Sequence, residues 1–199
     1  MRQNLNPMKF KIIILFFTIQ TAVFAQKNPC EYSVNVVDSL GTLKETKSCL
    51  VQEKVFGNTA QLVFLSLISD NNVPLLNLQI IQKSTDFIAP KCLDKNSKIY
   101  FQLSNGKIYT FLNSNESQCD NLLYNETEKL NNRMLDANFL FRNDDFEAIK
   151  KYPIIMMRIK FASETIDYIL PKQLISEKIS GSIFSPENFF IDNFSCIEN

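Results

Sequence analysis

Alternating apolar and polar positions run through most of the chain, and this pattern predicts strands more often than helices. The clearest alternation covers 155–161, and it continues over 166–170 after a short turn. Apolar runs bounded by turn residues predict further strands over 32–37, 42–52, 62–69, 75–82, 98–103, 108–112 and 139–141. Because short turns join most of these runs, we expect antiparallel hairpins.

Helix signals gather in the second half of the chain. The stretch 125–135 allows a short helix, and a second helix is predicted over 144–152, with Asp144 as its cap. An apolar stripe predicts a third helix over 171–180, and Ser-Pro opens another over 185–194. The expected fold class is therefore α+β, a mainly antiparallel sheet of hairpins with two or three helices packed on one face.

The strongest turn signal is the Asn-Gly pair at 105–106, which is typical of a two-residue hairpin loop. In that register, Tyr100 lies opposite Phe111 and Gln102 lies opposite Tyr109. These four side chains then form an aromatic and amide strip that can stack a sugar ring or hold an extended peptide. The competing interpretation is that this face is buried, so ligand binding requires exposed tyrosines.

The second clear hairpin turns near 163–164. Its alternation places one set of side chains inside and the set at 156, 158 and 160 outside. With the turn at that position, Ile159 pairs with Tyr168 on the inner face, and Lys160 lies opposite Asp167 on the outer face. A charged pair across strands contributes about 0.2–1 kcal/mol, so it helps to fix the register.

The N-terminus has the pattern of a secretory signal peptide. Basic residues precede an apolar run over 12–19, and small residues at Ala22 and Ala25 mark a cleavage site. The run is too short for a membrane span, which needs about 20 residues. We predict a signal peptide over 1–25 and one exported domain over 26–199, located in the periplasm, at the cell surface or outside the cell. An uncleaved membrane anchor is the alternative.

Composition narrows the possible functions. The 199-residue chain is 45% hydrophobic and has 21 basic and 21 acidic residues, no His and only 4 Gly. Without His, a Ser-His-Asp triad, a Cys-His pair and a His-ligated metal are excluded within the chain. Few glycines leave no phosphate-binding or dinucleotide-binding loop, and the balanced charge argues against nucleic acid. We therefore expect no metal, no cofactor, no nucleic-acid partner and no membrane span after signal removal.

All five cysteines follow the predicted cleavage site, so export would place them where disulfides form. Cys92 and Cys119 are equally distant from the Asn-Gly turn, which brings them together beyond the two strands. Closing this loop would stabilise the fold by about 3 kcal/mol on the chain-entropy model. Among the remaining three, Cys49 and Cys196 are the second predicted pair, because Cys30 lies near the mature terminus. The odd cysteine has no CxxC partner and no His to activate it.

Carboxylates supply the alternative function. A glycosidase-like hydrolase needs two carboxyl groups about 5–9.5 Å apart in a cleft, and the acidic residues at 144, 145 and 147 are close in sequence. Acidic residues are also favoured at a helix N-terminus, which explains the group without catalysis. The aspartates in predicted loops lack the spacing of a calcium-binding loop.

Several short stretches are similar to segments of other exported proteins. They are 83–88, 98–103 with 105–107, Met157-Arg158-Ile159-Lys160 and Cys196-Ile197-Glu198. Together they resemble a group of uncharacterised exported proteins of Bacteroidota-type bacteria, over most of the chain after residue 25. The resemblance implies export and a single domain, and it implies no activity.

These expectations favour an exported, non-enzymatic binding or interaction module of the periplasm or cell surface. Its partner would be a protein or a glycan of the cell envelope, and its candidate ligand-binding residues are Tyr100, Gln102, Tyr109 and Phe111. The alternative is a small secreted hydrolase that uses a carboxylate pair. A protein that blocks a partner enzyme is a further form of the binding function, and the sequence does not separate the two.

Overall fold

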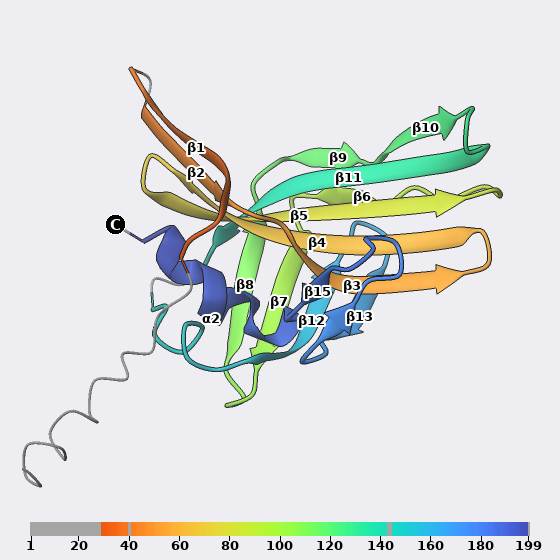
Figure 1. Cartoon of the computed structure of the whole chain (residues 1–199). Coiled ribbons are helices and arrows are strands. Elements are labelled where there is room, and N and C mark those ends of the chain that lie inside the picture. Colours follow the sequence, from red (N-terminus) through yellow and green to blue (C-terminus); the bar gives the residue numbers. More distant parts are fainter. Residues whose placement is uncertain (1–28, 40, 143–144, 199) are drawn as a thin grey trace, which may run out of the picture.

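The computed structural model describes residues 29–39, 41–142 and 145–198 of the chain (Figure 1). The signal peptide predicted over 1–25 lies outside these residues. Most of the described chain is β-strand. The strands are β1 (Tyr32–Asp38), β2 (Gly41–Thr46), β3 (Cys49–Phe56), β4 (Thr59–Asp70), β5 (Val73–Ser84), β6 (Cys92–Asp94), β7 (Lys98–Leu103), β8 (Ile108–Asn113), β9 (Ser117–Cys119), β10 (Asn121–Asn125), β11 (Leu130–Phe141), β12 (Ile154–Lys160), β13 (Thr165–Ile169), β14 (Leu174–Ile175) and β15 (Ile183–Phe184).

Within the described residues, one antiparallel sheet contains eleven strands. Their order is β1-β2-β4-β5-β11-β8-β7-β12-β13, with β3 beside β4 and β10 beside β11. Two small sheets pair β6 with β9 and β14 with β15. The antiparallel sheet predicted from the alternation is confirmed.

The longest strands are β4, β5 and β11, of 12 residues each, and with β3 they form what we term the long half of the sheet. The β4–β5 hairpin reverses at Asn71 and Asn72, whose φ angles are 49° and 69°. Asparagine tolerates this left-handed conformation, which suits a two-residue hairpin loop. Strands β8, β7, β12 and β13 form what we term the short half.

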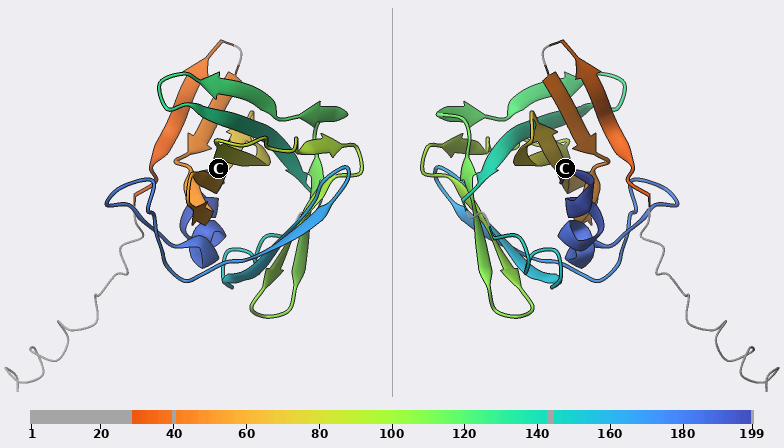
Figure 2. Two further views of the ribbon diagram at one scale, coloured as in Figure 1. Left: turned by 90° about the vertical axis from the view of Figure 1, so that its right-hand side faces the viewer. Right: turned by 90° about the vertical axis from the view of Figure 1, so that its left-hand side faces the viewer.

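The core lies between the two halves. Figure 1 shows β7 and β8 crossing the long strands steeply, and Figure 2 shows the sheet curling around the C-terminal helix. That helical segment consists of η2 (Pro186–Asn188), α2 (Phe189–Asn193) and η3 (Phe194–Cys196). The ring of Phe190 lies 5.0 Å from Phe101 and 5.7 Å from Phe111, between centroids. Such ring pairs contribute about 0.5–1.5 kcal/mol beyond the burial of their area, so the helical segment is part of the core.

The expected α+β class is wrong, because most of the predicted helices are strands or turns. The helix predicted over 185–194 is present as the short segment Pro186–Cys196. The stretch 125–135 instead contains the end of β10, a turn and the first half of β11. In the turn, Asn125 Oδ1 accepts hydrogen bonds from backbone N–H groups two and three residues further on. The described chain is therefore a curled antiparallel sheet with one short helical segment.

The apolar stripe over 171–180 forms β14 and the turn after it rather than a helix. The Glu53 carboxylate on β3 accepts hydrogen bonds from the hydroxyl of Ser176 and from the backbone N–H groups of Glu177 and Lys178, at 2.9–3.1 Å. These bonds hold the turn in place of helical ones. Because Glu53 is far away in sequence, local periodicity does not reveal them.

The stretch 144–152 forms successive turns over its described part, and Asp144 lies outside the described residues. The side chain of Asp145 accepts a hydrogen bond from the backbone N–H of Glu147 at 3.1 Å. This bond caps the first turn. Asp145 therefore has a structural role in this turn, which explains its presence without catalysis.

Of the two predicted disulfides, one is confirmed and one is wrong. Cys92 and Cys119 are bonded and lie opposite each other in the β6–β9 pair, with their Cα atoms 4.0 Å apart. Cys196 is bonded to Cys30 rather than to Cys49. The Tyr32 hydroxyl also donates a hydrogen bond to the backbone carbonyl of Cys196 at 2.9 Å, so β1 begins beside the C-terminal helix.

Cys49 is the cysteine left without a disulfide. Burial is the main cause that raises the pKa of its thiol to about 12, and the charge of Asp192 adds to the effect. A thiol with a raised pKa stays protonated at neutral pH, and the thiolate is the reactive form. Cys49 is thus a packed side chain, with a partly buried position against the core.

Candidate functional site

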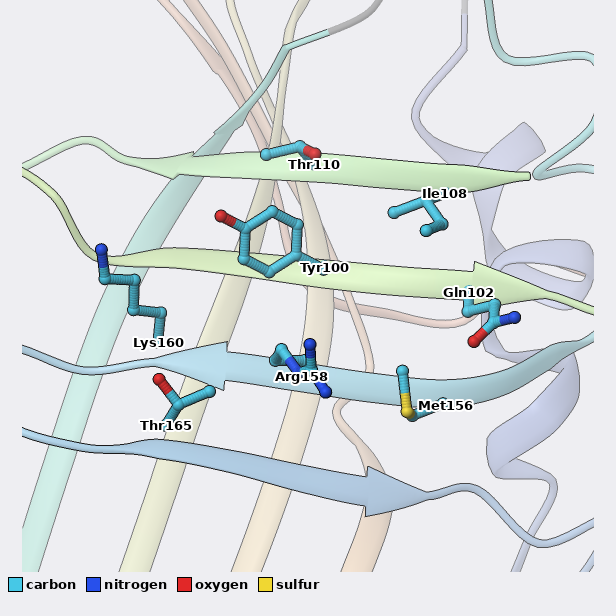
Figure 3. Close-up of a pocket in the computed structure, with 8 residues that line it drawn as sticks. All are labelled: Tyr100, Gln102, Ile108, Thr110, Met156, Arg158, Lys160 and Thr165. Carbon is cyan, nitrogen blue, oxygen red and sulfur yellow. The ribbon is translucent and has the colours of Figure 1, made fainter. Parts of the chain in front are cut away.

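A groove lies on the outer face of the short half of the sheet, on the side turned away from the core. We term it the outer groove, and its volume is about 560 Å³. Small-molecule sites are typically about 300–1,000 Å³, so the size suits a small ligand or one segment of a polymer. Its lining residues are Tyr100, Gln102, Ile108, Thr110, Met156, Arg158, Lys160 and Thr165 (Figure 3).

Strand alternation places these side chains on one face. On β7, Ile99 and Phe101 point inward and are fully buried, so Tyr100 between them points outward. On β12, Met157 and Ile159 are buried in the same way, and the residues that alternate with them, Met156, Arg158 and Lys160, face the groove. The hydrophobic core on the inner face therefore fixes the floor of the groove.

Three rows of side chains cross this outer face from strand to strand. From the β7–β8 loop outward, the rows are Ile108, Gln102 and Met156; Thr110, Tyr100 and Arg158; and Lys98, Lys160 and Thr165. The first row is mainly apolar, the second centres on an aromatic ring, and the third carries two cations. The groove therefore changes from apolar to cationic along the strands.

The structure keeps only half of the predicted strip in the groove. Tyr100 and Gln102 line it, whereas Tyr109 is 4% exposed and Phe111 is fully buried in the core. The Tyr109 hydroxyl donates a hydrogen bond to the backbone carbonyl of Asp145 at 2.9 Å. The assignment of Tyr109 and Phe111 as ligand-binding residues is therefore wrong.

The cause is the register of the β7–β8 hairpin. The backbone N–H of Leu103 bonds to the carbonyl of Lys107 at 2.9 Å, and Gly106 adopts a φ of 83°. The loop thus contains three residues rather than the predicted two, and the facing strand shifts by one position. A shift of one residue turns every side chain of a strand to the opposite face. Ile108 and Thr110 consequently take the outward positions.

The β12–β13 hairpin differs from its predicted register by two residues. Ile159 pairs with Ile166, and Arg158 rather than Lys160 lies opposite Asp167. A shift of two residues preserves the faces, because side chains alternate with a period of two. Tyr168 is therefore buried, as expected.

Arg158 and Asp167 form a two-pronged ion pair at the rim of the groove. The Nε–Oδ1 and Nη2–Oδ2 distances are 2.6 and 2.7 Å. The hydrogen bond from Arg158 is the largest cause that lowers the pKa of Asp167, and the same bond raises the pKa of Arg158. Both side chains are partly exposed, so solvent screens the pair and it mainly orients the guanidinium.

At the cationic end, Lys98 lies directly opposite the lining residue Lys160 and just beyond the residues that line the groove. Among the described residues, neither lysine forms a salt bridge. The charge of Lys160 does act on Asp94, whose pKa is lowered. Desolvation by burial, the largest single influence, raises this pKa, but hydrogen bonds from residues 96 and 97 and, as the weakest influence, the charge of Lys160 together lower it. Two opposed lysines on one face are an unfavourable pair unless an anion lies between them.

A smaller hollow near the β1–β2 and β4–β5 turns brings together two aspartates, Asp38 and Asp70. Each carboxylate accepts a hydrogen bond within its own turn. Asp38 accepts one from the backbone N–H of Gly41, and Asp70 accepts one from the side-chain amide of Asn71. These aspartates stabilise turns, and the outer groove contains no Asp or Glu among its lining residues.

Sequence alternation predicted that the side chains at 156, 158 and 160 share one face, but it did not place that face beside Tyr100. The missing information was the pairing of β12 with β7, which brings together strands that are far apart in the chain. Lys98 and Lys160 each lie two residues from a lining residue of their own strand. No sequence signal pairs them.

Comparison with known proteins finds no protein-family model, curated protein or solved structure that matches the chain. The class of the molecule therefore follows from its own features. It is a disulfide-bonded, mostly β protein with a groove on one face of its sheet. Within the described part of the chain, no helix is long and apolar enough to cross a membrane.

Proposed function

We propose that this protein is an exported, non-enzymatic binding module of the periplasm or cell surface, and that the outer groove is its ligand-binding site. The observation that carries the proposal is the lining of the groove, which combines a tyrosine ring with its hydroxyl, one amide, two threonine hydroxyls, two apolar side chains and two cationic groups on one sheet face. Such a mixture of apolar surface and a few polar groups is typical of binding sites. The partner is a protein or a glycan of the cell envelope.

The two disulfides support export, because disulfides persist in oxidising compartments. The signal-peptide pattern over 1–25 and the resemblance to exported proteins of Bacteroidota-type bacteria agree with this location. The location matters for the ligand, since a protein of the envelope meets cell-surface polymers and secreted proteins.

The lining also favours binding over hydrolysis. A carboxylate-pair hydrolase needs two carboxyl groups about 5–9.5 Å apart across the bound substrate. The outer groove has no carboxyl group among its lining residues, and Asp167 at its rim is held by Arg158. No geometric feature of the groove therefore supports the alternative hydrolase function.

Co-purification from the native envelope tests the proposal. The oxidised protein is isolated as wild type, as Tyr100→Ala and as Tyr124→Ala, and bound species are identified by mass spectrometry. Tyr124 is a matched control, since it is an exposed tyrosine on β10 of the same sheet, away from the groove. We expect wild type and Tyr124→Ala to retain the same species and Tyr100→Ala to lose it. Retention by Tyr100→Ala would refute the assignment of the groove.

A further inference from the structure

Within the described chain, the two lysines at the cationic end of the outer groove form no salt bridge. Lys98 on β7 and Lys160 on β12 occupy directly opposite positions on one face, where like charges repel. Their neighbour Arg158 is already paired with Asp167 at 2.6 Å. Asp94 interacts electrostatically with Lys160 and offsets part of this charge, while its carboxylate also accepts hydrogen bonds within its own turn. An anionic group bound between the two lysines would relieve their repulsion.

The middle of the groove supplies a flat aromatic surface. In Figure 3 the ring of Tyr100 is seen nearly face-on, with the strands of the long half behind it. Its face is thus turned away from the core. Around it lie the amide of Gln102 and the hydroxyls of Thr110 and Thr165. An aromatic face with hydrogen-bonding groups at its edge suits a ring that is apolar on its faces and polar at its rim, as a sugar is.

The position of the groove disfavours an extended peptide as the ligand. Peptides that add to a sheet bind at an edge strand through main-chain hydrogen bonds. The groove lies instead on the face of four strands that are already paired with each other, β8, β7, β12 and β13. Its floor therefore offers side chains, and backbone groups of β7 and β12 are used within the sheet.

We propose that the outer groove binds an acidic saccharide, with a sugar ring stacked on Tyr100 and its carboxylate held between Lys98 and Lys160. This inference rests on the proposed function and specifies the ligand class. Lys98 and Tyr100 are two residues apart on β7, or about 6.6 Å along the strand, which one sugar ring and its carboxylate can bridge. The apolar end at Ile108 and Met156 then covers the next ring of the polymer.

Calorimetric titration with defined oligosaccharides tests the ligand class. The probes are oligomers of galacturonic, mannuronic and glucuronic acid, the methyl esters of the same oligomers, and a poly-glutamate peptide of similar charge. We expect at least one uronic-acid oligomer to bind, its methyl ester to bind at least tenfold more weakly, and the affinity to fall as salt is raised.

Variants identify the groups involved. Lys98→Gln combined with Lys160→Gln should weaken binding of the acidic oligomer at least tenfold. Tyr100→Ala should do the same, whereas Tyr100→Phe should keep the ring and most of the affinity. Lys54→Gln is the matched control, because Lys54 is an exposed lysine on β3 of the long half. Circular dichroism in the near ultraviolet confirms that each variant is folded.

Three results would overturn the inference. Binding of poly-glutamate without any uronic-acid oligomer would replace the saccharide by an acidic peptide. Equal binding of ester and acid, unaffected by the lysine variants, would remove the role of charge. Failure of every uronic-acid oligomer, while an envelope species still requires Tyr100, would overturn this ligand class and leave the proposed function standing. Retention of the envelope species by Tyr100→Ala refutes the proposed function itself.

Discussion

One cluster of polar side chains on the outer face of the long half differs from the outer groove of the short half in how its polar groups are satisfied. On the long half, Asn77 donates to Asp136 at 2.7 Å and to Asn138 at 2.9 Å, and Gln79 also donates to Asp136. We term these four residues the polar ladder. On the short half, the opposed Lys98 and Lys160 have no such mutual bonds. The polar ladder is complete by itself, whereas the outer groove leaves charge and an aromatic face for a ligand.

This contrast agrees with a structural role for the polar ladder and with the binding role proposed for the outer groove. Side chains that bond to each other across strands fix the register and the stability of a sheet. Like-charged side chains directly opposite each other lower the stability of a sheet, and a role in ligand binding would explain their presence. Mutations in the polar ladder should therefore lower stability without changing binding, whereas mutations of the opposed lysines should weaken binding without lowering stability.

The largest expected effect tests the register of the β7–β8 hairpin. Phe111→Ala should lower the free energy of unfolding by about 3–5 kcal/mol, because it removes a fully buried ring. Tyr100→Ala should cost about 1 kcal/mol or less, since its side chain lies on the outer face. Urea unfolding of both variants measures the difference. Equal losses would contradict the one-residue shift that separates these two aromatic side chains.

The next effect concerns the polar ladder. Asn77→Ala removes two hydrogen bonds on the long half and should lower the free energy of unfolding by about 1–2 kcal/mol. It should leave the affinity of the outer groove unchanged, because the ladder lies on the other half. Chemical unfolding and the titration described above provide the two readouts. A loss of affinity without a loss of stability would reverse the assigned roles.

A smaller effect appears in the pH dependence of stability. The pKa of Asp167 is lowered in the folded protein, chiefly by its hydrogen bond from Arg158. This contribution is present above the unfolded-state pKa, near 3.8, and is lost as the pH falls through the lower folded-state pKa. Asp167→Asn should therefore flatten the fall of the urea midpoint below about pH 4. An unchanged slope would show that the pair does not act in solution.

The smallest expected effect is a gain of stability when one of the two opposed lysines is replaced. Lys98→Gln removes the like-charge contact with Lys160 and should raise the free energy of unfolding by about 0.2–0.5 kcal/mol at low salt. The gain should disappear at high salt, where the repulsion is screened. Thermal unfolding at two salt concentrations measures it. A loss of stability would mean that Lys98 has a structural partner.

The sequence predicted the strands well because burial on one face imposes a period of two, as on β7 and β12. It predicted the Cys92–Cys119 bond although the hairpin register was wrong. The three residues between Asp94 and Lys98 face four between Leu112 and Ser117, and this extra residue restores the alignment. Two opposite errors of one residue therefore cancelled.

The parts that failed depend on distant contacts. The helix expected over 171–180 is replaced by a turn because Glu53, on another strand, supplies its hydrogen bonds. Cys196 pairs with Cys30 because β1 begins beside the C-terminal helix. The prediction of Tyr109 and Phe111 as site residues failed for a local reason. An Asn-Gly pair fits hairpin loops of two or three residues, and the loop length decides which face of the sheet Tyr109 occupies.

Two methionines, one on the outer face of each half of the sheet, allow the assignment of the outer groove as the binding surface to be tested in one spectrum. Met156 lines the outer groove, and Met134, which is 42% exposed, lies on β11 beside the polar ladder residue Asp136. The measurement is a carbon-13 NMR spectrum of the methyl groups in methionine-labelled protein. It is recorded in two titrations, one with the uronic-acid oligomers and one with a fraction of envelope glycans and proteins. We expect the Met156 signal to shift in a saturable way and the Met134 signal to stay fixed. A shift of Met134 with Met156 unchanged would contradict the assignment of the groove as the binding surface.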